Sequence, residues 1–168
     1  FVDPIMGDEG HLYNGLTDET VKEMRKLIAQ ADYMVPNYTE AALLTGTAYE
    51  EKGTSKAEIQ ELLQKLHAIS GGSVVITSAK VDGADVVTGY DAKKKSYFLL
   101  PFDLIPVRFP GTGDIFSSIF MGDVLLGKDM EDATVKAMQA VREMILRNMD
   151  NQDTFKGIPI ETCLEVID

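Results

Sequence analysis

The chain has 168 residues, of which 45% are hydrophobic and 26% are charged. This length and balance are typical of a soluble globular protein with one domain and a sizeable core. The formal net charge of −11 argues against nucleic-acid binding through a basic face. The sequence contains no run of about 18 apolar residues, so it predicts no membrane span. We therefore expect one domain over residues 1–168, with no nucleic-acid partner and no membrane partner.

The chain offers few soft metal ligands. Its single cysteine, Cys163, leaves no partner for an internal disulfide and is typical of a reducing cytoplasm, where we expect the protein to lie. Only Cys163, His11 and His67 could supply thiolate or imidazole groups, so a zinc site is not expected. The sequence also lacks a Walker P-loop, and the glycine pair Gly111 and Gly113 lacks the third glycine of a Rossmann fingerprint.

Hydrophobic periodicity and capping signals predict alternating strands and helices. In chain order we expect the end of a strand at 1–4, a glycine-rich loop at 7–15, a helix capped by Thr17, a buried strand at 32–35, a helix from 38 or 39 to 46, and a helix after a capping box at 55–58. After these we expect a strand at 73–77, a hairpin of two strands at 84–90 and 96–100, a helix from the glycine turn to about 127, a helix over roughly 131–148, and a short C-terminal helix.

This alternation predicts an α/β fold, with three layers (α/β/α) around a mainly parallel sheet. In such sheets ligands gather at the carboxyl ends of the strands. Four polar clusters follow strands or open helices in this sequence, and we expect them to share one site: 3–8, 37–40, 77–78 and 111–114.

The cluster Gly111-Thr112-Gly113-Asp114 opens a strongly apolar helix. Backbone N–H groups at a helix start lack intrahelical partners and suit an anion, and glycines allow a phosphate to approach them closely. An acid beside that phosphate can take a proton from an attacking hydroxyl group. The alternative is an ordinary helix start in which Asp114 favours the helix dipole.

The other three clusters each allow two interpretations. Asp3 and Asp8 offer hard oxygen ligands that suit Mg²⁺, or they form an ordinary acidic turn. Asn37 and Glu40 form a capping box, or they lie near nucleotide phosphates and the water shell of a metal. The hydroxyl groups at 77–78 satisfy backbone groups, or they contact a phosphate or a monovalent cation.

Taken together and in order, the four motifs resemble those of the ribokinase-like superfamily, and within it the pyridoxal (pyridoxine, pyridoxamine) kinases. They are Asp-Pro-Ile-Met-Gly-Asp at 3–8, Val-Pro-Asn-Tyr-Thr-Glu-Ala-Ala-Leu-Leu-Thr-Gly at 35–46, Val-Val-Ile-Thr-Ser at 74–78 and Gly-Thr-Gly-Asp at 111–114. The resemblance implies phosphorylation of the 5′-hydroxyl of a B6 vitamer by ATP, as in vitamin B6 salvage, with Mg²⁺ and a monovalent cation such as K⁺. Its partners would be the vitamer and ATP, and the intact protein would be a homodimer.

The resemblance also implies roles for individual residues. Asp114 would be the catalytic base, and Gly111, Thr112 and Gly113 would form the anion hole. The metal-associated acids would be Asp3, Asp8 and Glu40. The nucleotide contacts would be Asp3, Asn37, Glu40, Thr77, Ser78, Tyr13, Ile105 and Val107, the last two on the adenine side.

The chain begins with Phe1, and members of the resembled family carry a further N-terminal part. We therefore expect the ATP-binding, C-terminal portion of a ribokinase-like kinase, without most of the acceptor site. Two further hypotheses stay open from the sequence: a hydroxymethylpyrimidine (phosphate) kinase, and a catalytically inert fragment that binds nucleotide.

Overall fold

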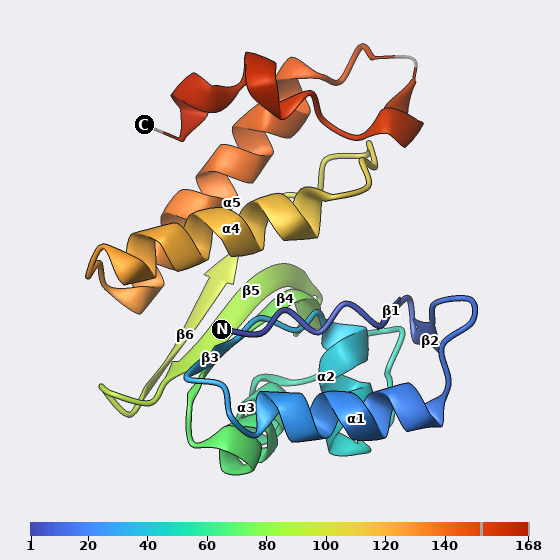
Figure 1. The fold of residues 1–168 in the computed structure, drawn as a ribbon, viewed down its shortest axis with the longest axis vertical. Helices are drawn as coiled ribbons and strands as arrows, with labels where there is room; N and C mark the ends of the chain where they lie inside the picture. Colours follow the sequence, from blue (N-terminus) through green and yellow to red (C-terminus); the bar gives the residue numbers. More distant parts are fainter. Residues whose placement is uncertain (152, 168) are drawn as a thin grey trace. The chain divides into compact units, whose positions relative to one another are not determined.

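The computed structural model describes residues 1–151 and 153–167. They form two compact units, Phe1–Phe102 and Asp103–Asp168, which are described separately (Figure 1). The first unit contains β1 (Gly7–Asp8), β2 (His11–Leu12), α1 (Asp18–Ile28), β3 (Tyr33–Met34), α2 (Tyr38–Thr45), α3 (Lys56–Ser70), β4 (Ser73–Val81), β5 (Ala84–Asp91) and β6 (Ser96–Pro101). The second contains α4 (Thr112–Leu125), α5 (Met130–Arg147) and the 3₁₀ turns η1 (Thr154–Lys156), η2 (Ile160–Thr162) and η3 (Leu164–Val166).

The first unit is built on a four-stranded sheet of order β3-β4-β5-β6. Strand β3 pairs with β4 in parallel, and Val2 adds a parallel bridge to Met34, as expected for a strand end at residues 1–4. The α/β class is therefore confirmed. The predicted hairpin is confirmed, because β5 and β6 pair antiparallel, but β4 and β5 pair antiparallel as well, so the sheet is mixed. The reason is local: the turn at Asp82-Gly83 joins β4 to β5 directly, and so short a connection joins only antiparallel strands.

Helices α1, α2 and α3 cover one face of this sheet (Figure 1). Their apolar side chains and those of the strands form one buried core. Leu63 and Leu66 of α3 and Val74 and Ile76 of β4 are all fully buried. Burying a side chain of this size is worth roughly 1.5–3 kcal/mol, so this contact holds α3 on the sheet.

The predicted caps fix the ends of α2 and α3. In each helix the side chain of the N-cap accepts the N3 backbone N–H, and the N3 glutamate accepts the N-cap N–H: Asn37 with Glu40, and Ser55 with Glu58. Helix α3 stops at Gly71, whose φ of 74° is left-handed and therefore suits glycine.

A two-stranded hairpin, β1–β2, lies where the sequence predicts only a glycine-rich loop. Its turn is Glu9-Gly10, with φ values of 52° and 82°, the left-handed pair that a tight hairpin needs. A Cβ placed on Gly10 would lie 2.8 Å from the Tyr49 ring, so that ring packs directly on the turn. Sequence reasoning missed the hairpin because Glu-Gly is a weaker turn signal than Asn-Gly or Asp-Gly.

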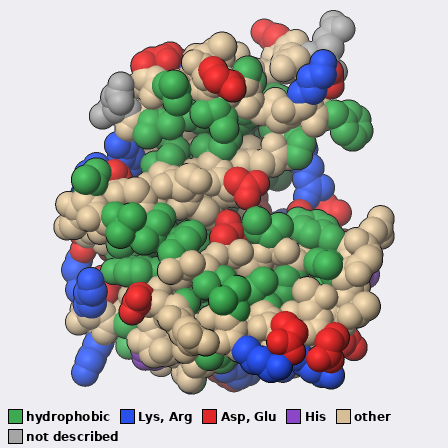
Figure 2. Space-filling model, in the orientation of Figure 1, with side chains coloured by type: hydrophobic (Ala, Val, Ile, Leu, Met, Phe, Trp, Pro, Cys, Tyr) green, Lys and Arg blue, Asp and Glu red, His purple; other side chains and the backbone are tan. Residues whose placement is uncertain are grey.

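In the second unit α4 packs against α5. The rings of Phe116 and Phe120, both on α4, stack with centroids 6.2 Å apart, and Ala133 and Ala137 of α5 are fully buried. The short C-terminal helix that the sequence suggests is replaced by the three 3₁₀ turns. In the described part of the chain, no helix combines the length and apolarity needed to cross a bilayer. The face drawn in Figure 2 carries acidic and basic side chains as well as large hydrophobic areas.

Candidate functional site

Three of the four predicted polar clusters come together in the first unit. Asn37, which ends the connection from β3, forms a parallel bridge with Thr77 of β4, and the Thr77 N–H donates to the Pro36 carbonyl at 3.0 Å. The Asn37 side-chain amide donates to the Gly7 carbonyl at 2.8 Å. The clusters 3–8, 37–40 and 77–78 therefore meet around the start of α2.

Glu40 is the most buried acidic residue of this region, with 3% of its surface exposed. Its Oε1 accepts the Met6 N–H at 2.8 Å, and its Oε2 accepts the Asn37 N–H at 2.9 Å. The carboxylate thus joins two segments that lie 34 residues apart in the sequence. The capping interpretation is correct as far as it goes, and the bond to Met6 adds a tertiary contact that a capping box alone does not need.

The surroundings of Glu40 act on its pKa in opposite directions. Burial raises the pKa to about 7, and the negative charge of Asp3 adds to that increase. Backbone N–H groups of Met6, Asn37 and Gly7 lower it, because they stabilise the charged form. Burial has the largest effect, so Glu40 takes up a proton near neutral pH.

The two aspartates of the first cluster are half-buried, and the charge of Asp3 acts on Glu40. Asp8 accepts the Glu9 N–H at 2.9 Å, within the hairpin turn. Tyr13 is 46% exposed, and its backbone N–H donates to the Met6 carbonyl at 2.9 Å. Over the described residues, no group of three or more His, Cys, Asp or Glu side chains is arranged to hold a metal ion.

Ser78 lies at an irregularity in β4. The pairing of β4 with β5 shifts register between Ile76 and Ala79, and Ser78 has a φ of 57° and is exposed. Among the described residues, the other non-glycine positions with left-handed φ are Glu9, Asp82 and Lys95, which lie in hairpin turns. This bulge redirects the strand after Thr77, and backbone strain of this kind is frequent at functional sites.

The fourth cluster opens α4 in the second unit. Gly111 is the N-cap, with a left-handed φ of 87°, and the Ile115 N–H donates to its carbonyl at 3.0 Å. The amides of Thr112, Gly113 and Asp114 are thus the groups of the first turn that no intrahelical acceptor serves. Gly113 and Asp114 are exposed.

The Asp114 carboxylate folds back over the glycine turn. A Cβ placed on Gly111 would lie 3.8 Å from Asp114 Oδ2, whereas one placed on Gly113 would meet no described heavy atom within 4 Å. An acid therefore lies beside an open, electropositive helix start. Ile105 and Val107 lie in the segment before this turn, where the Val107 N–H donates to the Ile105 carbonyl at 2.8 Å.

Sequence reasoning gave Thr39 no role. Its hydroxyl oxygen accepts the Gly10 N–H at 2.9 Å, and the residue is 2% exposed. A threonine in the first turn of a helix usually bonds locally, so the sequence held no signal for a bond to the hairpin.

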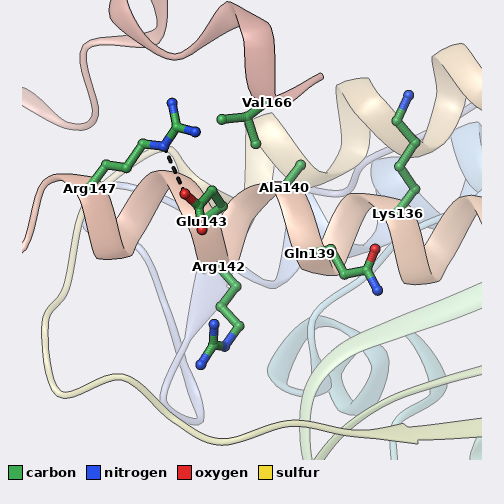
Figure 3. A pocket seen from close by; sticks show the side chains of 7 residues that line it. All are labelled: Lys136, Gln139, Ala140, Arg142, Glu143, Arg147 and Val166. Carbon is green, nitrogen blue, oxygen red and sulfur yellow. Dashed lines mark hydrogen bonds and ion pairs between the residues drawn. The ribbon is translucent and has the colours of Figure 1, made fainter. Parts of the chain in front are cut away.

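A pocket of about 510 Å³ lies elsewhere, on the second unit, and Figure 3 shows its lining. Arg147 is held there by Glu143 at 2.8 Å and by Glu165, while Arg142 points to the other side of α5 (Figure 3). The side chains that line the pocket diverge instead of converging on one point. They belong to Lys136, Gln139, Ala140, Arg142, Glu143, Arg147 and Val166, and none of these is a site residue predicted from the sequence.

Comparison with known proteins shows consistent likenesses. Pyridoxal kinase of Arabidopsis thaliana is 30% identical over 170 residues, which cover 98% of this chain and 53% of that protein. A Bacteroides thetaiotaomicron protein named after phosphomethylpyrimidine kinase, solved with pyridoxal, superposes with a TM-score of 0.91 at 33% identity, over 99% of this chain and 59% of that one. Pyridoxal kinase from Lactobacillus plantarum gives a TM-score of 0.87 at 28% identity, over 98% and 59% of the two chains.

The chain thus spans about half the length of the curated relatives that it matches. The sequence model of the phosphomethylpyrimidine kinase family matches residues 1–158, nearly the whole chain. The chain therefore belongs to the phosphomethylpyrimidine kinase family, within the ribokinase-like kinases that its four motifs resemble.

Proposed function

We propose that the protein containing this chain transfers the γ-phosphoryl group of ATP to the 5′-hydroxyl of pyridoxal, pyridoxine or pyridoxamine. The family membership supports a kinase. The relatives named pyridoxal kinase, and the similar Bacteroides protein solved with pyridoxal, support a B6 vitamer as acceptor. The proposal includes vitamin B6 salvage in the cytoplasm by a homodimer of the intact protein.

One observation carries this proposal: an exposed carboxylate lies over an open glycine turn at the start of α4. Phosphoryl transfer requires charge stabilisation around the transferring group and a base near the attacking hydroxyl. The amides of Thr112, Gly113 and Asp114 supply the first, because they point out of the helix start. The Asp114 side chain supplies the second.

The 5′-oxygen of the vitamer attacks the γ-phosphorus and forms the new O–P bond, while the bond from that phosphorus to the β–γ bridging oxygen breaks. The hydroxyl proton passes to the Asp114 carboxylate, and ADP leaves with the electron pair of the broken bond. The helix-start amides hold the oxygens of the phosphoryl group throughout.

In this proposal the first unit contacts the nucleotide. Asn37, Thr77 and Ser78 meet at one edge of the sheet, where hydroxyl and amide groups suit phosphate oxygens. Tyr13 is exposed on the segment after the hairpin and supplies an aromatic face near the nucleotide. Ile105 and Val107, both half-buried, supply apolar contacts to the adenine.

The acids of the first unit fit a Mg²⁺ ion that is held mainly through water and phosphate. Mg²⁺ keeps several waters and needs only one or two carboxylates beside substrate phosphates, which Asp3 and Asp8 can provide. Glu40 fits the outer water shell, because backbone amides already occupy both of its oxygens. Bound there, the ion would neutralise charge on the phosphate oxygens. We also propose a monovalent cation such as K⁺ near the hydroxyl groups of Thr77 and Ser78.

Two other functions remain as competitors. The name of the matched family favours hydroxymethylpyrimidine or its phosphate as the acceptor. The other competitor binds nucleotide without transferring a phosphoryl group, and the polar groups of the first unit alone would serve that function. Both share the proposed nucleotide site, so the acceptor decides between them.

The test is Asp114→Asn, with Asp132→Asn as the matched control. Both residues are exposed acids in the first turn of a helix, in α4 and α5 respectively. Loss of the base should lower the rate of pyridoxal phosphorylation by about 10²–10⁴ while ATP affinity changes little. The control should retain the native rate. Native turnover in Asp114→Asn would refute the assignment of the base.

A further inference from the structure

Three hydrogen bonds tie the first turn of α2 to the segment that carries Asp3 and Asp8. The Glu40 carboxylate accepts the Met6 N–H at 2.8 Å, and the Thr39 hydroxyl accepts the Gly10 N–H at 2.9 Å. The Asn37 amide donates to the Gly7 carbonyl at 2.8 Å. Each bond spans about 30 residues of sequence, and each reaches the backbone of the segment, so the contacts fix its path whatever its side chains are.

The other capping box of the chain shows what a cap alone requires. Glu58 of α3 accepts the Ser55 N–H at 2.8 Å and the hydroxyls of Ser55 and Thr54, all within four residues, and its pKa is lowered by these bonds. Glu58 is exposed, whereas Glu40 is 3% exposed. Capping therefore does not explain why the Glu40 carboxylate is buried, and the Met6 amide does.

We infer that Glu40 is a positioning residue, which acts with Thr39 and Asn37 as a clamp that holds the 3–10 segment against the start of α2. The backbone amides already occupy one lone pair on each Glu40 oxygen, so the main contacts of this carboxylate are with the protein backbone. Asp3 and Asp8 flank the clamped residues Met6 and Gly7. Their carboxylates keep their places only while the clamp is closed.

The consequence for catalysis rests on the proposed function. If Asp3 and Asp8 serve Mg²⁺ and the nucleotide, opening the clamp displaces both acids together. Affinity for the nucleotide should then fall at every Mg²⁺ concentration. Substitution of a residue that only ligates the metal has a different result, because excess Mg²⁺ then restores the affinity for the nucleotide.

The test compares Glu40→Gln with Glu58→Gln in the protein that contains this chain, free of metal and nucleotide. Glutamine keeps one acceptor oxygen and replaces the other with an N–H donor, so it cannot accept from both Met6 and Asn37. Hydrogen exchange of the Met6 amide or of the Asn37 amide should be roughly ten- to hundredfold faster in Glu40→Gln, since one of these two donors loses its acceptor. Glu58→Gln should leave Met6 exchange at the native rate.

The second readout is the KM for ATP at low and at saturating Mg²⁺. The clamp predicts a raised KM in Glu40→Gln that saturating Mg²⁺ does not restore. Native exchange at both Met6 and Asn37 would overturn the inference, and so would a defect that excess Mg²⁺ removes. If the protein proves not to be a kinase, the exchange result still decides the clamp, because it needs no substrate.

Thr39→Val keeps the test decisive if Glu40→Gln does not fold. Valine has nearly the shape of threonine and lacks only the hydroxyl that accepts the Gly10 N–H. Exchange of the Gly10 amide should be about tenfold faster or more, because one partly buried bond is lost. Unchanged exchange at Gly10 would overturn the clamp.

Discussion

Gly113→Ala separates the two interpretations of the α4 start. The control is Gly122→Ala, because both glycines are exposed on the same helix, and a Cβ on either would meet no described heavy atom within 4 Å. Neither substitution should strain the fold. Only Gly113 lies in the first turn, beside the amides that we assign to the phosphate.

Gly113→Ala should affect stability and ligand binding in opposite directions. Alanine is favoured over glycine inside helices by roughly 0.5–1 kcal/mol, so Gly122→Ala should raise the free energy of unfolding by about that much and Gly113→Ala by no more. For ligand binding, a methyl group on Gly113 keeps a phosphate from the nearby N–H. Losing one charge-assisted hydrogen bond costs about 1.5–3 kcal/mol, which corresponds to roughly 10- to 150-fold weaker binding.

The assay is calorimetric titration of Mg·ATP into the two variants and the native protein, with urea unfolding as a check on the fold. We expect weak binding in Gly113→Ala despite native or higher stability, and native binding in Gly122→Ala. Equal affinities in both variants would refute the anion hole and leave the turn as an ordinary helix start.

Three further predictions concern the first unit. The raised pKa of Glu40 stabilises the folded state fully below about pH 4.5, and that contribution is lost as the pH rises through about 7. At 1.36 kcal/mol per pKa unit, the free energy of unfolding of the native protein, relative to that of Glu40→Gln, should therefore fall by up to about 3 kcal/mol from pH 4.5 to pH 8, as followed by urea unfolding. Ser78→Gly should leave the free energy of unfolding unchanged or raise it by up to about 1 kcal/mol, whereas Ser78→Val should lower it, because φ is 57° there. A fall in the Ser78→Gly melting temperature would contradict that reasoning. Gly89→Ala should destabilise by about 1–3 kcal/mol in the same assay, since its Cβ would overlap the Phe98 ring and lie 2.8 Å from the Val74 carbonyl oxygen. A native unfolding curve for this variant would show that the sheet gives way at little cost.

Much of the fold could be predicted because its signals are local. The capping boxes at Asn37 and Ser55 set the starts of α2 and α3, and Gly71 ends α3. The β-branched run at 73–77 predicts a buried strand, and β4 begins there. Its extension to Val81 was missed because the bulge at Ser78 interrupts the pattern of the strand.

The direction of β5 relative to β4 could not be predicted in the same way. Apolar strands suggest parallel neighbours, but strand direction depends on how the chain returns, and the Asp82-Gly83 turn makes β5 antiparallel to β4. The prediction of a single domain over 1–168 stays a prediction.

In the candidate site, too, some features follow from local sequence signals and others depend on tertiary packing. Strand ends and helix starts are sequence features, so the meeting of residues 3–8, 37–40 and 77–78 could be anticipated from the α/β pattern. The contacts of Glu40 with Met6 and of Thr39 with Gly10 could not, because they join backbone groups whose path is set by tertiary packing. The assigned roles of the site residues stay predictions.

The most direct test of the account is the acceptor panel. The protein that contains this chain is incubated with Mg·ATP and either pyridoxal or hydroxymethylpyrimidine, and both ADP and the phosphorylated product are quantified. The account predicts equal amounts of ADP and pyridoxal 5′-phosphate, and far slower phosphorylation of the pyrimidine. Preferential phosphorylation of the pyrimidine, or no transfer to either acceptor, would contradict it.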